Sequence, residues 1–170
     1  IVRDLTLNYS VVLKEKTILI LGAGGAAKGI IPALIKEDPS AIVVSNRTIS
    51  RAESLAKLTS GYPLDVLEWG ANLNYQPDLV INATSLSLSN ELPDLGGQVI
   101  GLGSIVYDMG YTVGPTRFMS FSGSLGATQV MDGLGMLVEQ AAEAFFVWHG
   151  VFPETSSVIE ALRNGDSLNS

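Results

Sequence analysis

The stretch TILILGAGGAAKG at residues 17–29 constrains the fold more than any other part of the chain. It begins with a continuous apolar run of strand length, which is typical of a parallel strand buried on both faces. The run stops in glycines and continues with helix-forming residues. Gly22, Gly24 and Ala27 have the G-x-G-x-x-G/A spacing of a dinucleotide-binding turn, in which backbone N–H groups at a helix N-terminus meet a pyrophosphate. By itself, a glycine turn with a purely structural purpose would explain the same pattern.

Strand-like and helix-like segments alternate through the rest of the chain. Apolar runs of strand length occupy residues 41–45, 79–81 and 105–108, and a shorter candidate lies at 64–67. The run at 105–108 is the last strand predicted. Between these runs, apolar residues recur at helical spacing after the glycine turn and again after Thr48. Such alternation predicts an α/β fold, namely a Rossmann-like, doubly wound parallel sheet in three layers (αβα).

The last third of the chain is expected to hold two helices. Asp132 is a candidate N-cap for a long helix that ends near His149. Ser157 and Glu160 form a plausible capping box, which predicts a C-terminal helix within residues 154–166.

The start of the chain resembles the inside of a helix rather than a terminus. It reads IVRDL, without an initiating Met. We therefore expect residues 1–13 to be a hinge or linker helix region. The 170 residues are expected to be a single domain, 1–170, of a longer protein.

Composition argues against several classes of function. Lys and Arg number 10 against 17 Asp and Glu, so the net charge of −7 argues against nucleic acid as a partner. The chain has no Cys, which excludes disulfides and thiolate metal sites and is compatible with a reducing cytoplasm, the location that we expect. No metal is expected. No uncharged apolar stretch reaches the roughly 20 residues that a membrane helix needs, so we expect no membrane contact.

The end of the strand at 41–45 favours a phosphorylated cofactor. NAD-specific folds place an Asp or Glu at this position to bind the ribose hydroxyls of the adenosine. Here the chain reads SNRT, with Arg47 and Arg51 one helical turn apart and Thr48 able to donate at the helix start. Two solvated surface arginines are the alternative interpretation. In an otherwise acidic chain, the pair favours a bound 2′-phosphate and therefore NADP.

No convincing acid/base pair for proton transfer emerges from the sequence. His149, the only histidine, ends a helix, where a cation interacts favourably with the helix dipole. Lys28 lies in the phosphate-binding helix and is better explained as solvated or as steering phosphate. Asp108 and Tyr111 follow a strand and could face a cleft, but Asp108 could equally tie down its own loop. We therefore expect no catalytic residue in this chain.

Five motifs in order resemble the cofactor domain of the shikimate dehydrogenase family, and the resemblance extends over nearly the whole chain. They are GAGGAAKG, NRTISRAESLA, INATS, YDMGY and DGLGMLVEQAAEAFFVWHG. Members of this family interconvert 3-dehydroshikimate and shikimate with NADP, in aromatic amino acid biosynthesis. The resemblance implies that the chain is the NADP-binding domain of such an oxidoreductase, which would be a monomer or a homodimer.

The resemblance also implies roles for individual residues. Cofactor-binding residues would be Gly22, Ala23, Gly24, Gly25 and Ala26 at the pyrophosphate, Asn46, Arg47, Thr48 and Arg51 at the adenosine with its 2′-phosphate, and Ala83, Thr84, Met109 and Gly133 beside the nicotinamide. Tyr111 and Gln140 match family residues that reach the bound substrate, shikimate or 3-dehydroshikimate.

Two features of the sequence differ from a complete member of the family. The family's catalytic Lys and Asp belong to an N-terminal substrate domain, which would precede Ile1. The resemblance therefore implies that the 170 residues of this chain bind NADP but do not turn over shikimate by themselves. It also implies that the substrate is bound through the other domain. The residues after INATS also differ from the family's usual Gly and Met, because here they are Leu86, Ser87 and Leu88.

Two other functions stay open at this point. One is a free-standing dinucleotide-binding or sensor module that never had a catalytic partner. The other is a related two-domain enzyme that acts on quinate with NAD. The arginine pair argues against NAD use, and the start within a helix argues against a free-standing module.

Overall fold

A computed structural model describes residues 1–59, 61–97 and 99–165 of the chain. It divides into two compact units. The larger unit is Val12–Asp132, and the smaller one joins Ile1–Val11 to Gly133–Ser170. None of the helices in the described residues has the length and apolar character needed to span a membrane.

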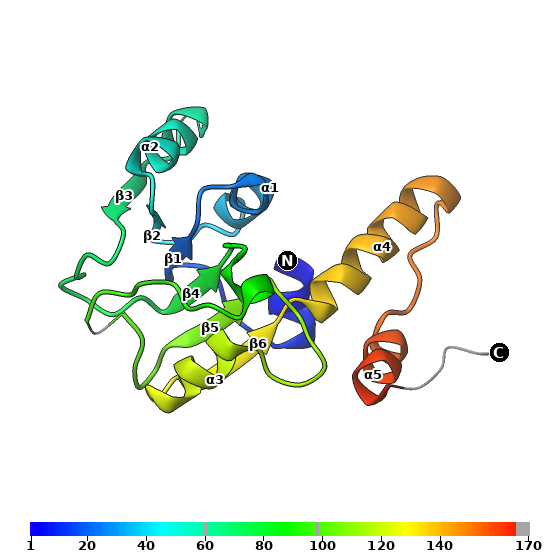
Figure 1. Ribbon diagram of the computed structural model, residues 1–170. Helices are drawn as coiled ribbons and strands as arrows, with labels where there is room; N and C mark the ends of the chain where they lie inside the picture. The colour runs from blue at the N-terminus through cyan, green and yellow to red at the C-terminus, as the bar shows by residue number, and fades with distance from the viewer. Residues whose placement is uncertain (60, 98, 166–170) are drawn as a thin grey trace. The chain divides into compact units, whose positions relative to one another are not determined.

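The larger unit is built on a six-stranded, all-parallel sheet in the order β3-β2-β1-β4-β5-β6 (Figure 1). The strands are β1 (Thr17–Leu21), β2 (Ala41–Asn46), β3 (Leu64–Glu68), β4 (Leu79–Asn82), β5 (Ile105–Asp108) and β6 (Gln129–Asp132). From β1 the chain first winds outward through β2 to β3, then returns to the other side of β1 and continues through β4 to β6. The strand order therefore reverses between β1 and β4.

Helices cover both faces of this sheet. Their bounds are α1 (Gly25–Ile35), α2 (Ile49–Leu58) and α3 (Arg117–Ser124), and a short 3₁₀ turn, η2, spans Leu86–Ser89. Because crossovers between parallel strands are right-handed, the reversal in winding places α1 and α2 on one face and α3 on the opposite face, as Figure 1 shows. The predicted doubly wound αβα fold is confirmed.

The central strands are buried on both faces. The aliphatic side chains of β1 and β4 are at most 2% exposed, which explains why both strands read as uninterrupted apolar runs in the sequence. Phe118 of α3 packs against a cluster that includes Leu19 and Val106. Each such side chain contributes about 1.5–3 kcal/mol when it is fully buried.

A polar clamp joins β1 and β4 at the amino edge of the sheet. The Thr17 amide and hydroxyl donate to Asp78 Oδ2 at 2.9 and 2.8 Å, and Lys16 Nζ lies 3.0 Å from Asp78 Oδ1. Burial alone would raise the pKa of Asp78. The hydrogen bonds from Thr17 and Lys16 outweigh burial and hold this pKa below its ordinary value of 3.8.

The smaller unit consists of a short π-helix, η1 (Asp4–Asn8), with α4 (Leu134–His149) and α5 (Ser156–Asn164). A buried carboxylate accepts the hydrogen bonds that connect its segments. Glu139 of α4 accepts hydrogen bonds from Arg3 Nε at 2.7 Å, Thr155 Oγ1 at 2.7 Å and Asn8 Nδ2 at 3.4 Å. Burial acts to raise the pKa of Glu139, but these donors outweigh it and lower the pKa. One side chain thus holds three separate segments together.

The predicted start of the long helix was wrong. Asp132 does not cap α4, because it ends β6, a strand that the sequence did not predict; the N-cap of α4 is Gly133. β6 is a four-residue edge strand, QVMD, too short and too polar to stand out. The long helix does end at His149, as predicted.

The predicted capping box of the C-terminal helix was also wrong. The N-cap of α5 is Thr155, and Glu154 takes the capping role instead. The Ser157 hydroxyl and the amides of Ser156 and Ser157 donate to its carboxylate and lower its pKa to about 2. The helix lies within the predicted range 154–166, of which residue 166 falls outside the described residues.

A buried hydroxyl without a partner leads to a stability prediction. Ser122 Oγ on α3 is the only buried side-chain nitrogen or oxygen of the described residues that has no hydrogen-bond partner. Since an unsatisfied buried hydroxyl is unfavourable, Ser122→Ala should stabilise the chain by about 1 kcal/mol and raise Tm by about 2–4 °C. Thermal denaturation followed by circular dichroism measures this shift.

Ser120→Ala on the same helix is the matched control. Ser120 is exposed, and its hydroxyl donates to the Thr116 carbonyl at 3.1 Å. Its replacement should leave Tm nearly unchanged. A Tm for Ser122→Ala at or below that of the unmodified chain would contradict the explanation.

Candidate functional site

The loops that follow four strands meet at the carboxyl edge of the sheet, where the strand order reverses. Backbone hydrogen bonds continue across the sheet past the strand ends: Gly22 N to Ser45 O at 2.7 Å, Ala83 N to Leu21 O at 2.9 Å, and Met109 N to Asn82 O at 3.0 Å. The loops after β1, β2, β4 and β5 are therefore fixed against one another. Such a reversal point is where open α/β sheets bind their ligands.

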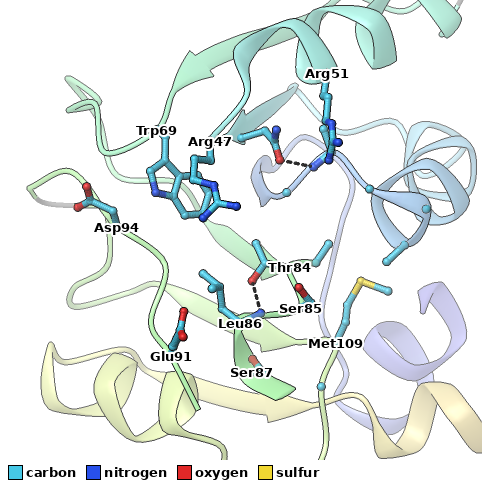
Figure 2. A pocket seen from close by; sticks show the side chains of 18 of the residues that line it. Arg47, Arg51, Trp69, Thr84, Ser85, Leu86, Ser87, Glu91, Asp94 and Met109 are labelled. Atoms are coloured by element: carbon cyan, nitrogen blue, oxygen red, sulfur yellow. Dashed lines mark hydrogen bonds between the residues drawn. The ribbon is translucent and has the colours of Figure 1, made fainter. Parts of the chain in front are cut away.

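A pocket of about 680 Å³ lies at this edge, within the larger unit. It is lined by Gly22, Ala23, Gly24, Gly25, Ala26, Asn46, Arg47, Arg51, Trp69, Ala83, Thr84, Ser85, Leu86, Ser87, Glu91, Leu92, Asp94, Met109 and Gly110. Figure 2 shows Arg47 and Arg51 on one side of the pocket and Ser87 and Met109 on the opposite side. Trp69 and Asp94 lie along one wall in the same view.

The glycine turn brings two backbone segments close together. Gly22 has φ +103°, and a Cβ there would lie 3.0 Å from the Ala83 carbonyl oxygen. The next glycines are exposed and face open space. α1 begins at Gly25 with Gly24 as its N-cap, and no side chain caps its first turn. Its first N–H groups and the positive end of its dipole thus face the pocket, an arrangement suited to phosphate.

The end of β2 joins the glycine turn to the start of α2. Asn46 Oδ1 accepts from the Ala23 amide at 3.1 Å, and Asn46 Nδ2 donates to the Thr48 carbonyl at 2.8 Å. The Asn46 side chain therefore holds the two loops in place. Arg47 and Arg51 are exposed and line the pocket, whereas Thr48 does not line it and its side chain does not cap α2.

The end of β4 is organised by a fully buried amide. Asn82 Oδ1 accepts from the Thr84 amide at 3.2 Å and from the Thr84 hydroxyl at 2.7 Å. The Leu86 amide donates in turn to Thr84 Oγ1 at 3.3 Å. The INATS motif therefore forms a turn that its own side chains hold in shape.

Asp108, at the end of β5, is fully buried and holds loops together rather than facing the pocket as an acid. It accepts hydrogen bonds from Asn82, Ser87, Gly110 and Thr116. Of the two alternatives that the sequence left open for Asp108, the structure supports the one in which it ties down its loop.

Most of the predicted cofactor residues come together in this pocket. Gly22 to Ala26, Asn46, Arg47, Arg51, Ala83, Thr84 and Met109 line it, and Thr48 does not. Tyr111 is 48% exposed and does not line it either. Gly133 and the exposed Gln140 belong to the smaller unit, so their proposed roles stay predictions.

Several lining residues were missed by the sequence analysis. They are Trp69, Ser85, Leu86, Ser87, Glu91, Leu92, Asp94 and Gly110. Trp69 directly follows β3, so an aromatic residue at a strand end was the available signal. The others belong to the loop after β4 or to the YDMGY motif, and no periodicity marks which of them face inward.

Two residues that the sequence analysis considered for proton transfer, Lys28 and His149, are not among those that line the pocket. Lys28 is exposed on α1 and does not line the pocket. His149 ends α4, with its ring centroid 4.3 Å from that of Phe145. The described residues contain no cluster of three or more His, Cys, Asp or Glu side chains able to hold a metal ion.

These features together define a dinucleotide-binding domain. A glycine turn opens α1 at the reversal point of a doubly wound parallel sheet, and the pocket beside it extends from two arginines to the ends of β4 and β5.

The chain belongs to the shikimate / quinate 5-dehydrogenase family. The model of that family matches residues 5–89, and the model of the shikimate 5′-dehydrogenase C-terminal domain matches residues 133–163. A relative from Marinobacter nauticus is named shikimate dehydrogenase (NADP(+)). It is 50% identical to this chain over 167 residues, and the match covers 96% of this chain and 60% of that protein.

Solved structures give the same result. An Ael1 enzyme from Pseudomonas putida superposes with a TM-score of 0.89 and 38% identity, over 94% of this chain and 59% of its own. Shikimate dehydrogenase from Aquifex aeolicus superposes with a TM-score of 0.76 and 31% identity, over 95% of this chain and 58% of its own. The chain thus spans about three fifths of the length of the proteins that it matches.

The close approach at the glycine turn can be tested with Gly22→Ala. The new Cβ would stand 3.0 Å from the Ala83 carbonyl oxygen, on a backbone with φ +103° that alanine rarely adopts. We expect a loss of about 1–3 kcal/mol of stability, measured by urea denaturation.

Gly29→Ala is the control for this prediction. Gly29 is exposed inside α1, and nothing lies within 4 Å of a Cβ there. Alanine should therefore stabilise the helix by about 0.5–1 kcal/mol. Equal stability of the two variants would show that the turn tolerates a side chain.

Proposed function

We propose that this chain is the NADP-binding domain of a shikimate dehydrogenase, which reversibly reduces 3-dehydroshikimate to shikimate. The observation that carries the proposal is the position of Arg47 and Arg51. They line the pocket at the end of β2, where an NAD-specific fold would place a carboxylate. Membership in the family and a relative named for NADP use support the same conclusion.

The pyrophosphate would bind at Gly22 to Ala26, where uncapped N–H groups of α1 face the pocket. The two guanidinium groups would bind the 2′-phosphate with charge-assisted hydrogen bonds. Asn46 supports this site, because its side-chain amide bonds both to the glycine turn at Ala23 and to Thr48 at the start of α2.

The nicotinamide would lie at the opposite end, beside Ala83, Thr84 and Met109. Gly133 is proposed for the same end on the strength of the family resemblance. Tyr111 and Gln140 are proposed for the substrate on the same basis.

The bound cofactor would supply hydride to the C3 ketone. Residues of this chain would hold the nicotinamide ring beside Ala83, Thr84 and Met109. The proton that the new hydroxyl needs would come from the family's Lys and Asp, which belong to a domain outside these residues. The oligomeric state, monomer or homodimer, and a cytoplasmic location remain predictions.

The arginine pair is tested by Arg47→Ala combined with Arg51→Ala. Loss of two charge-assisted contacts should weaken NADP binding by about 100-fold, while the weaker affinity for NAD changes little. Titration calorimetry of the chain with each dinucleotide gives the two constants. Lys57→Ala, which removes an exposed cation from the last turn of the same helix, should change neither. Unchanged NADP affinity in the double variant would remove the 2′-phosphate assignment.

Turnover is the second test. The reversible reaction is proposed to need an acid/base group outside these residues. The chain should therefore bind NADP but produce no NADPH from NADP and shikimate. Absorbance at the nicotinamide band follows the reaction. Measurable turnover would mean that the proton-transfer groups lie within this chain.

The two other functions remain alternatives with distinct outcomes. A quinate enzyme that uses NAD would bind NAD at least as tightly as NADP. A sensor module would bind dinucleotide without any upstream catalytic domain in its gene product, which mass spectrometry of the native protein would reveal.

A further inference from the structure

A buried carboxylate connects four segments around one end of the pocket. Asp108 is 0% exposed, and no Lys or Arg side chain of the described residues bonds to it. Its donors are Thr116 Oγ1 at 2.6 Å, Ser87 Oγ at 2.7 Å, Asn82 Nδ2 at 3.1 Å and the Gly110 amide at 3.1 Å. They belong to the N-cap of α3, the η2 turn, the end of β4 and the loop after β5, respectively.

Among the three side chains that donate to Asp108, Ser87 is the one that lines the pocket. Its hydroxyl donates to the Asp108 carboxylate, 2.7 Å from Oδ2 and 2.9 Å from Oδ1, and accepts from Asn82 Nδ2 at 2.9 Å. Both hydrogen-bonding functions of the hydroxyl are thus directed at buried groups. The η2 turn is thereby held against the ends of β4 and β5.

A steric contact reinforces these hydrogen bonds. A Cβ at Gly110 would lie 2.9 Å from Ser87 Cβ and 3.4 Å from Asp108 Oδ1. Gly110 must therefore lack a side chain for Ser87 to reach the carboxylate. The turn after β4 and the loop after β5 are fitted to each other at this contact.

We propose that Ser87, through Asp108, is a positioning residue that sets the nicotinamide end of the pocket in its binding geometry before the cofactor arrives. The inference rests on the proposed function. A loop that is already ordered loses less conformational entropy on binding, which strengthens affinity for the part of the ligand that it contacts. Ser87 and Met109 lie across the pocket from Arg47 and Arg51 (Figure 2), so this effect is confined to one half of the dinucleotide.

The test uses Ser87→Ala and two ligands, NADP and 2′-phospho-ADP-ribose, which lacks the nicotinamide. Titration calorimetry of the chain should show NADP binding weakened roughly 3- to 10-fold, and 2′-phospho-ADP-ribose binding changed by less than about two-fold. Ser89→Ala is the matched control. Ser89 is an exposed serine of the same turn, its hydroxyl donates to the Leu86 carbonyl at 3.1 Å, and it does not line the pocket. Its replacement should change neither constant.

The remaining outcomes overturn the inference in distinguishable ways. An equal loss for both ligands would mean that Ser87 merely stabilises the fold. No loss for either would mean that the contact with Asp108 does not position the pocket. An unmodified chain that binds neither ligand would remove the proposed function itself, and the inference with it.

A second pair of variants tests the steric part. Gly110→Ala should weaken NADP binding in the unmodified chain, because its Cβ meets Ser87. Combined with Ser87→Gly, which clears that space, it should weaken NADP binding no further than Ser87→Gly does alone. An undiminished effect of Gly110→Ala in the Ser87→Gly background would show that Gly110 is constrained by something else.

Discussion

The site depends on a row of backbone hydrogen bonds that extends the sheet beyond its strands. Gly22 bonds to Ser45, Ala83 to Leu21 and Met109 to Asn82, so the first residue of each loop still belongs to the ladder. Each loop therefore leaves the sheet at a fixed place and in a fixed direction. The pocket has its shape because strand pairing continues slightly past the point where the side chains stop being apolar.

The same edge is where polar side chains become buried. A buried amide or carboxylate is unfavourable unless its hydrogen bonds are made. Asn82 and Asp108 are both fully buried, and their partners are the loops that shape the pocket. Their hydrogen bonds therefore stabilise these loop conformations.

Much of the larger unit could be predicted from the sequence, because buried parallel strands leave a signal that survives without an alignment. β1, β2, β4 and β5 are continuous apolar runs, and the glycine turn is set by spacing. β6 could not be predicted in the same way, because a four-residue edge strand is buried only in part. Because β6 was not predicted, Asp132 was assigned as the N-cap of the following helix. An Asp that ends a strand and an Asp that caps a helix look alike in sequence.

The residues that line the pocket also include some that the sequence could predict and some that it could not. Arg47 and Arg51 were predictable because they replace a residue that the fold normally requires. Glu91 and Asp94 were not, because they come from an irregular segment whose side-chain directions depend on contacts far apart in the sequence. Gly97 N, for example, donates to Asn72 Oδ1 at 2.6 Å, across 25 residues. No local pattern encodes a contact of that kind.

The distribution of charge around the pocket determines where on its lining an anionic group is favoured. The chain has a net charge of −7, so its long-range field repels an anion, and attraction must come from short-range groups. Arg47, Arg51 and the N-terminus of α1 supply it on one side, whereas Glu91 and Asp94 place carboxylates along another part of the lining. An anionic group is therefore favoured beside Arg47, Arg51 and the N-terminus of α1 and disfavoured beside Glu91 and Asp94. The acidic surroundings therefore disfavour non-specific anion binding, so that anions are favoured where N–H groups and guanidinium groups converge at short range.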